Sequence, residues 1–327
     1  MPTNELIKND FFENQAISIL PYVQIARPDH WFKNIFIFPG IIFGIYDSPD
    51  LLSWQIIPPI IIGLISTCLI ASANYIINEV LDAPTDALHP VKKKRPVPSG
   101  LVNVKIAYAQ WILFVIIGLV AAWMINGFFF ISALLLLIMG LLYNLPPVRL
   151  KDLPYLDVLA ESVNNPIRLF LGWFAVNDSY PPTLSLIIAY WMIGAFFMAV
   201  KRYAEYRRIG DPQRAGKYRK SFIHYNEYRL LLSIVYYVSA FGLFFGIFLI
   251  RYRMELILSA PFIAGFIAVY MRIGFKKNSP AQYPEKLYTQ KSLVIYSVLF
   301  FILFITLLFI DIPIIHLIFQ PYHLPGG

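Results

Sequence analysis

Long apolar runs, separated by short polar or basic segments, make up most of this 327-residue chain. Most of them approach the roughly 20 residues that an α-helix needs to cross the hydrocarbon core of a bilayer. They occupy residues 34–47, 54–78, 105–125, 127–143, 155–176, 183–203, 230–250, 255–274 and 292–310. The pattern predicts an all-α membrane protein with nine transmembrane helices in a single polytopic domain over residues 1–327. We expect residues 1–30 to form a cytoplasmic or interfacial N-terminal segment.

The composition supports a membrane protein. The chain is 58% hydrophobic and only 14% charged, whereas a soluble domain carries roughly a quarter charged residues. The first thirty residues are polar and mixed in charge, which predicts no cleavable signal peptide. The single cysteine, Cys68, excludes an internal disulfide and lies in an apolar run, as a small packing residue would.

The distribution of cations predicts the orientation of the chain. Cytoplasmic loops of membrane proteins are enriched in lysine and arginine. When alternate loops are counted from the N-terminus, 24 of the 27 lysines and arginines fall on one side; the exceptions are Arg168, Arg251 and Arg253. The N-terminus is therefore expected in the cytoplasm and the C-terminus outside. A basic cytoplasmic face against anionic lipid explains the net charge of +8, and we expect no nucleic-acid partner.

A stripe of oxygen-bearing side chains closes the second predicted helix. Asn78, Asp82 and Asp86 are spaced by four, so they share one helix face, and Glu79 lies beside them. Mg²⁺ prefers such oxygen ligands and completes its octahedron with water and substrate phosphate. Four consecutive cations, residues 92–95, begin six positions after the last aspartate. The combination predicts a site for a metal-bound phosphate or diphosphate at the membrane surface.

The fifth predicted helix carries a second polar stripe. Asp157, Glu161, Asn164 and Arg168 follow at intervals of four, three and four, which places them on one face. Ionisable residues inside a membrane are costly and often functional. One alternative stays open, in which Arg168 pairs with a carboxylate of the stripe and serves only to hold the helices together.

Further basic residues lie near the ends of the predicted helices. Lys201 and Arg202 end the sixth helix, with Glu205 one turn beyond Lys201. Such cations either bind a phosphate or reflect topology and lipid contact. The segment before the first helix is open to the same two interpretations, with Trp31 and Lys33 as an interfacial anchor or as part of a phosphate site.

These residues resemble the UbiA superfamily of intramembrane prenyltransferases, which carries an Asn-Asp-x-x-Asp-x-x-x-Asp motif at the end of the second span. In this chain the motif runs from Asn78 to Asp86, with Glu79 in place of the usual first aspartate. The longer carboxylate either reaches the metal or supports its ligands. The resemblance implies a helical bundle around a central cavity open to the cytoplasmic side, a Mg²⁺ cofactor, and a bacterial or archaeal cell membrane.

Two further motifs resemble the phosphoribosyltransferase branch of that superfamily, which transfers phosphoribosyl from phosphoribosyl pyrophosphate (PRPP) to a polyprenyl phosphate. They are Arg27-Pro-x-x-Trp-x-Lys-Asn34 and His89-Pro-x-Lys-x-x-Arg-Pro-x-x-Ser-Gly100. Tyr143 and the Arg149-x-Lys151 pair are similar to the wider superfamily. Where that wider superfamily has a second aspartate pair for another Mg²⁺, this chain has Lys201-Arg202-x-x-Glu205. Direct contact between cations and phosphate would then replace a second metal bridge.

Three functions remain open. The leading hypothesis is phosphoribosyl transfer from PRPP to a polyprenyl phosphate. The second is transfer of a prenyl group from a prenyl diphosphate to an aromatic or quinone-precursor acceptor, and the third is transport of phosphorylated, lipid-linked cargo. The candidate catalytic residues are Asp82, Asp86, Asp157 and Glu161, and the candidate metal ligands are Asn78, Glu79, Asp82 and Asp86. The candidate substrate-binding residues are Lys33, Asn34, Lys92, Arg95, Tyr143, Arg149, Lys151, Asn164, Arg168, Lys201, Arg202, Glu205, Arg219 and Lys220.

Overall fold

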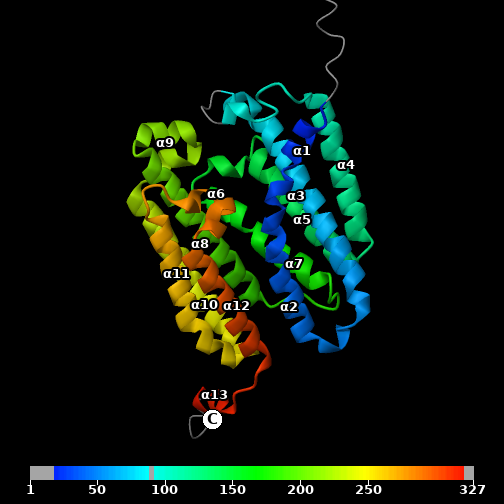
Figure 1. Ribbon diagram of the computed structural model, residues 1–327, viewed down its shortest axis with the longest axis vertical. Helices are drawn as coiled ribbons and strands as arrows, with labels where there is room; N and C mark the ends of the chain where they lie inside the picture. The colour runs from blue at the N-terminus through cyan, green and yellow to red at the C-terminus, as the bar shows by residue number, and fades with distance from the viewer. Residues whose placement is uncertain (1–17, 88–91, 320–327) are drawn as a thin grey trace, which may run out of the picture. The chain divides into compact units, whose positions relative to one another are not determined.

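The computed structural model of the chain describes residues 18–87 and 92–319, and its regular structure within those ranges is entirely helical (Figure 1). Seven helical segments there are long and apolar enough to cross a membrane. They are Trp54–Asp86, Val104–Trp123, Gly127–Asn144, Leu184–Ile209, Glu227–Tyr252, Met254–Gly274 and Lys291–Phe309. Each overlaps one of the predicted apolar runs, which confirms the all-α membrane class.

The two remaining predicted spans are interrupted helices. The run at 34–47 begins in a 3-10 helix, η1 (Pro28–Ile37), and continues as α2 (Phe38–Asp47). The run at 155–176 is divided at Val163 into α6 (Leu156–Ser162) and α7 (Asn164–Phe174). Pro166 lacks the N–H that would bond the carbonyl of Ser162, which explains the division. The polar stripe expected on one continuous helix is therefore shared between two.

The chain divides into two compact units, and the first comprises residues up to Ile35 together with Ser53–Leu145. Its elements are α1 (Leu20–Ala26), η3 (Trp54–Ile56), α3 (Ile57–Asp86), η4 (Lys92–Lys94), α4 (Val104–Trp123) and α5 (Gly127–Asn144). Helix α3 packs against α1, α4 and α5. The close approach of α4 and α5 to α3 depends on small residues. A Cβ on Gly140 of α5 would lie 2.1 Å from the Asn74 side chain of α3, and Ser66 of α3 donates to the Gly118 carbonyl of α4 at 2.8 Å.

The second unit comprises Phe36–Leu52 and the residues from Pro146 onward. Its helix α8 (Leu184–Ile209) packs against α6, α7, α10 (Glu227–Tyr252) and α11 (Ala260–Gly274) around a core that includes Phe196 and Leu230. The other helices are α2 (Phe38–Asp47), α9 (Pro212–Tyr218), α12 (Lys291–Phe309) and α13 (Pro313–Ile318). Short 3-10 turns complete the unit: η2 (Pro49–Leu51), η5 (Leu150–Asp152), η6 (Lys220–His224), η7 (Met254–Ser259), η8 (Pro280–Gln282) and η9 (Pro284–Thr289).

Helices α2 and α7 cross at two glycines. A Cβ added to Gly40 would lie 2.1 Å from the Leu169 carbonyl oxygen, and one on Gly172 would lie 2.0 Å from the Ile37 carbonyl oxygen. Both obstacles are backbone atoms, which cannot rotate away.

We predict that Gly40→Ala and Gly172→Ala each lower the free energy of unfolding by about 1–3 kcal/mol, the usual cost of overpacking. Thermal unfolding in detergent measures the effect. Gly246→Ala in α10 is the matched control, because no atom beyond its chain neighbours and the adjoining backbone of α10 lies within 4 Å of its added methyl group. Equal melting temperatures for all three variants would show that α2 and α7 do not cross at these glycines.

Candidate functional site

Helix α3 presents the predicted metal-binding stripe at its C-terminal end. The helix continues without interruption to Asp86, so Asn78, Asp82 and Asp86 lie on one face. Asn78 and Asp82 are partly exposed, whereas Asp86 is buried. The helix continues through Pro84, so the three residues keep the arrangement that their spacing predicts.

A chain of amide contacts orients Asn78. The Nδ2 of Asn144 donates to the Gly140 carbonyl at 2.8 Å, so the Oδ1 of Asn144 is left to accept from the Nδ2 of Asn78. Because the Asn78 nitrogen is engaged in that bond, its carbonyl oxygen is the atom that remains to ligate a metal. The donor set of one amide oxygen and two carboxylates fits a hard divalent cation.

Asp86 is held by the basic segment that follows α3. The Nη1 of Arg95 lies 2.7 Å from Asp86 Oδ2, and the Nζ of Lys92 lies 3.5 Å from Oδ1. The structure therefore brings together the carboxylate stripe and two of the cations that the sequence placed beside it. His89, part of the same sequence motif, lies outside the described residues.

Glu79 lies beside the stripe and interacts electrostatically with Asp86 and Arg95. Its side chain is buried, and Oε1 accepts the backbone N–H of Val97 at 3.1 Å. Val97 follows the basic segment by two residues, so Glu79 anchors the loop that carries Lys92 and Arg95. This contact favours a supporting role for Glu79 over direct metal ligation.

The N-terminal motif packs along α3. The guanidinium of Arg27 and the ammonium of Lys33 lie 5.5 and 5.8 Å from the ring centroid of Tyr75, one turn before Asn78. Asn34 is buried and donates to the sulfur of Cys68 at 3.2 Å. Trp31 donates to Ser72 at 2.9 Å. Lys33 thus lies nearer the stripe along α3 than Asn34 does. Tyr143, another candidate, precedes Asn144 on α5 and is half-buried.

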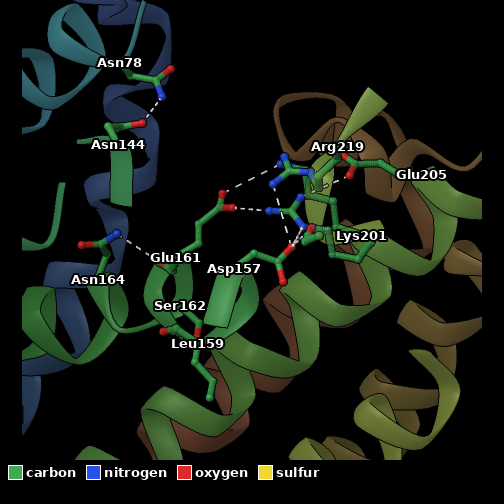
Figure 2. Close-up of polar contacts among 12 residues, drawn as sticks. Asn78, Asn144, Asp157, Leu159, Glu161, Ser162, Asn164, Lys201, Glu205 and Arg219 are labelled. Carbon is green, nitrogen blue, oxygen red and sulfur yellow. Dashed lines mark hydrogen bonds and ion pairs between the residues drawn. The ribbon is translucent and has the colours of Figure 1, made fainter. Parts of the chain in front are cut away.

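In the second unit, the polar site is built around Arg202 of α8. The side chain is 0% exposed. Its Nε donates to Asp157 Oδ2 at 3.0 Å, its Nη2 to Glu161 Oε2 at 2.7 Å and its Nη1 to Glu205 Oε2 at 3.2 Å. Figure 2 shows the side chains of these three carboxylate residues drawn together with Lys201 and Arg219.

The Arg202 contacts change the role that the sequence suggested for this residue. All three guanidinium nitrogens are engaged by carboxylates, so Arg202 fits a role in holding the site together better than direct contact with a substrate phosphate. It is also a partner of the polar stripe. Arg168, which the sequence offered as a partner, donates to the Asn164 carbonyl at 3.3 Å.

Asp157 is the most enclosed carboxylate of this cluster. In addition to Arg202, it accepts hydrogen bonds from Ser221 Oγ at 3.1 Å and from the Tyr225 hydroxyl at 2.7 Å. Burial, together with the neighbouring Asp157 carboxylate, raises the pKa of Tyr225 above its usual value, so the hydroxyl stays protonated and donates. Neither Ser221 nor Tyr225 was among the predicted residues. Both belong to the basic stretch after α9, but nothing in their spacing links them to Asp157.

Several predicted cations surround the Arg202 cluster. Lys201 lies 3.9 Å from Glu161, and Arg219 lies 3.9 Å from Asp157. Three carboxylates are therefore matched by three cations, and charge balance is what allows the cluster to be buried. Asn164 contributes its amide to the Glu161 carbonyl at 3.1 Å.

A second cationic group forms around Asp152, just before α6. Arg149 lies 3.1 Å and Lys220 3.5 Å from this carboxylate, and Lys151 beside it is buried. The Lys220 side chain is 74% exposed. Asp152 was not predicted as a site residue, although it directly follows the predicted Lys151.

The apolar helices and the buried ionic cluster define an integral membrane protein with polar sites built into its helices. The sequence matches the UbiA prenyltransferase family over residues 35–305, and the chain belongs to this family of transferases.

Comparison with curated proteins finds several relatives. The decaprenyl-phosphate phosphoribosyltransferase of Mycolicibacterium smegmatis is 28% identical over 227 residues, covering 68% of this chain and 69% of that protein. The enzyme of the same name from Mycobacterium tuberculosis is 29% identical over 189 residues, and the match spans only 59% of its length. The digeranylgeranylglyceryl phosphate synthase of Sulfurisphaera tokodaii is 25% identical over 257 residues, covering 75% of this chain and 87% of that protein.

The same fold occurs in solved structures. A UbiA homolog from Archaeoglobus fulgidus bound to GPP and Mg²⁺ superposes with a TM-score of 0.67 at 21% identity, covering 89% of this chain and all of that one.

We predict that Arg202→Met lowers the free energy of unfolding by about 3–5 kcal/mol, because it leaves buried carboxylates without their counterion. Arg207→Met on the same helix is the matched control: Arg207 is 41% exposed and lies 3.7 Å from Glu227, so its loss should cost at most about 1 kcal/mol. Thermal unfolding in detergent compares the two. Adding Glu161→Gln should recover part of the loss in Arg202→Met, and equal stability of the two single variants would contradict the prediction.

Proposed function

We propose that this chain is a Mg²⁺-dependent transferase that moves 5-phosphoribosyl from PRPP to a polyprenyl phosphate and releases pyrophosphate. The observation that carries the proposal is the Arg202 cluster. In the described part of the second unit, Asp157, Glu161 and Glu205 are neutralised by an internal guanidinium. They do not form the open acidic pair that a second metal on a prenyl diphosphate would need. The names of the mycobacterial relatives agree with this choice.

In the first unit, Asn78, Asp82 and Asp86 would hold the metal, and Glu79 would fix the adjoining loop. Bound Mg²⁺ would supply positive charge to the pyrophosphate leaving group. Lys92 and Arg95 contact Asp86 in the free protein. When the pyrophosphate binds, these two cations would exchange the carboxylate for phosphate oxygens and stabilise the charge that develops on them. Lys33 and Tyr143 would lie along the same substrate.

In the second unit, the exposed cations would contact the remaining phosphates. Lys201, Arg219 and Lys220 are the candidates, with Arg149 and Lys151 beside them. Glu205 and Arg202 would position them. Asn164 and Arg168 of α7 would contribute further polar contacts to substrate.

The transfer breaks the bond between ribose C1 and a pyrophosphate oxygen and forms a bond from C1 to an oxygen of the lipid phosphate. The acceptor oxygen is already anionic, so the step needs no general base. Glu161, whose side chain is 27% exposed, would stabilise positive charge on C1, whereas the fully buried Asp157 would act through Arg202.

We also propose that the single domain crosses the membrane nine times. The seven long helices would be joined by two interrupted spans, η1–α2 and α6–α7. The excess of cations in alternate loops supports a cytoplasmic N-terminus and an external C-terminus.

Prenyl transfer is the second candidate. Family members carry this chemistry in their names, such as the digeranylgeranylglyceryl phosphate synthase, and a solved relative is bound to GPP and Mg²⁺. Transport of phosphorylated, lipid-linked cargo is a third candidate, but the carboxylate stripe with adjoining cations fits transfer chemistry better.

One assay separates the candidates. Purified protein and Mg²⁺ are incubated with radiolabelled PRPP and decaprenyl phosphate and, separately, with a prenyl diphosphate and 4-hydroxybenzoate. We expect label from PRPP in the lipid fraction, dependent on Mg²⁺. Prenylated benzoate without labelled lipid would establish the second candidate instead. Asp82→Asn should abolish the transfer while the melting temperature stays close to that of the wild type.

We further predict that Glu79→Gln keeps the Mg²⁺ concentration needed for half-maximal activity unchanged, because the amide oxygen still accepts the Val97 N–H. Glu79→Ala should raise the KM for PRPP by freeing the loop that carries Lys92 and Arg95. Titration of activity with Mg²⁺ and with PRPP distinguishes the two effects. If Glu79→Gln requires much more Mg²⁺, the carboxylate is a metal ligand.

A further inference from the structure

Helix α10 carries an arginine near each end, and neither is used by the proposed reaction. Arg229 donates to the His224 carbonyl at 2.8 Å, and it has no carboxylate partner among the side chains described, residues 18–87, 92–283 and 287–319. Arg251 is exposed and has no ion pair within the same ranges. Arg253, two residues further on, differs because it lies 3.2 Å from Glu255. Arg229 and Arg251 therefore present guanidinium groups that an external anion could bind.

Each of these arginines lines a hollow on the surface of the second unit. The first hollow has a volume of about 370 Å³, and its walls include Tyr155, Leu159, Arg229, Leu232 and Tyr236. The second has a volume of about 390 Å³, and its walls include Thr183, Ser185, Phe244, Ile247 and Arg251. Both combine one cation, hydroxyl groups and an apolar wall. That combination suits an amphiphile with an anionic head.

The separation of the two arginines matches a bilayer. They are 22 positions apart on one uninterrupted helix, which corresponds to about 33 Å at 1.5 Å per residue. The hydrocarbon core of a bilayer is about 30 Å thick, so the two guanidinium groups would reach opposite headgroup layers. Leu232 and Ile247, which lie between them, are 50% and 45% exposed and would meet lipid chains.

We propose that α10 binds an anionic phospholipid at each end, with one headgroup phosphate on Arg229 and the other on Arg251. Charge complementarity selects this occupant, because a guanidinium forms strong, directed hydrogen bonds to phosphate. Tyr155 and Tyr236 at one hollow, and Tyr252 at the other, are aromatic side chains of the kind that settle at the headgroup level. The lipid phosphate that accepts the phosphoribosyl group would need a site in one leaflet only. Arg229 and Arg251, in contrast, lie at opposite ends of α10.

Native mass spectrometry of the full chain in detergent tests the proposal. With added phosphatidylglycerol, the wild type should retain two tightly bound lipids. Arg229→Gln and Arg251→Gln should each weaken one of the two binding steps roughly five- to tenfold, and the double variant should weaken both. Phosphatidylcholine, which carries no net charge, should bind more weakly than phosphatidylglycerol.

Arg272→Gln is the matched control. Arg272 is also an exposed arginine at the end of a membrane-spanning helix, but it lines neither hollow. Equal loss of lipid in this variant, or no loss in the α10 variants, overturns the proposal. Displacement of phosphatidylglycerol by millimolar inorganic phosphate would assign the arginines to a soluble anion. Displacement by equimolar decaprenyl phosphate would assign them to the substrate, and either result would also refute the proposal. Bound lipid is counted without catalysis, so the result is independent of the proposed reaction.

Discussion

The guanidinium of Arg202 is the charge on which the second unit depends. It is fully buried and lies between carboxylates from α6 and from its own helix α8. Burying these acids without a counterion would cost several kilocalories per mole each. Asp157 also accepts hydrogen bonds from Ser221 and Tyr225, so the same network fixes η6 and the residue that follows it. The groups that shape the polar site are therefore also the groups that join its helices.

The first unit positions its polar side chains by a different means. Its stripe needs no buried ion pair between distant helices, because regular α-helix geometry aligns Asn78, Asp82 and Asp86. What the tertiary structure adds is orientation. Asn144 fixes the Asn78 amide, and Glu79 holds the backbone at Val97 so that Lys92 and Arg95 reach Asp86.

This contrast explains what could be predicted from sequence. The seven membrane-spanning segments follow from the length of the apolar runs, and the α3 stripe follows from a spacing of four residues. Both are local patterns, which hold wherever the chain is helical. The interruption at Val163 was missed because apolar content outweighed the signal of Pro166. The pairing of Asp157 and Glu161 with Arg202 was also missed, because Arg202 lies 45 and 41 positions away. Spacing rules reach only one or two helical turns, so they point only to candidates on the same stretch, such as Arg168.

An arginine and a metal ion neutralise acidic side chains in different ways. A guanidinium stays protonated and covalently attached, so the charge of the second site does not vary with the concentration of free Mg²⁺. Its donors are also directed, and in this protein all three nitrogens are committed to carboxylates. Arg202 therefore cannot bridge a substrate phosphate as a metal ion would. An anionic ligand at this site must be met by Lys201 and Arg219, each of which lies 3.9 Å from its carboxylate. The shorter contacts of Arg202, at 2.7 to 3.2 Å, keep the carboxylates in place.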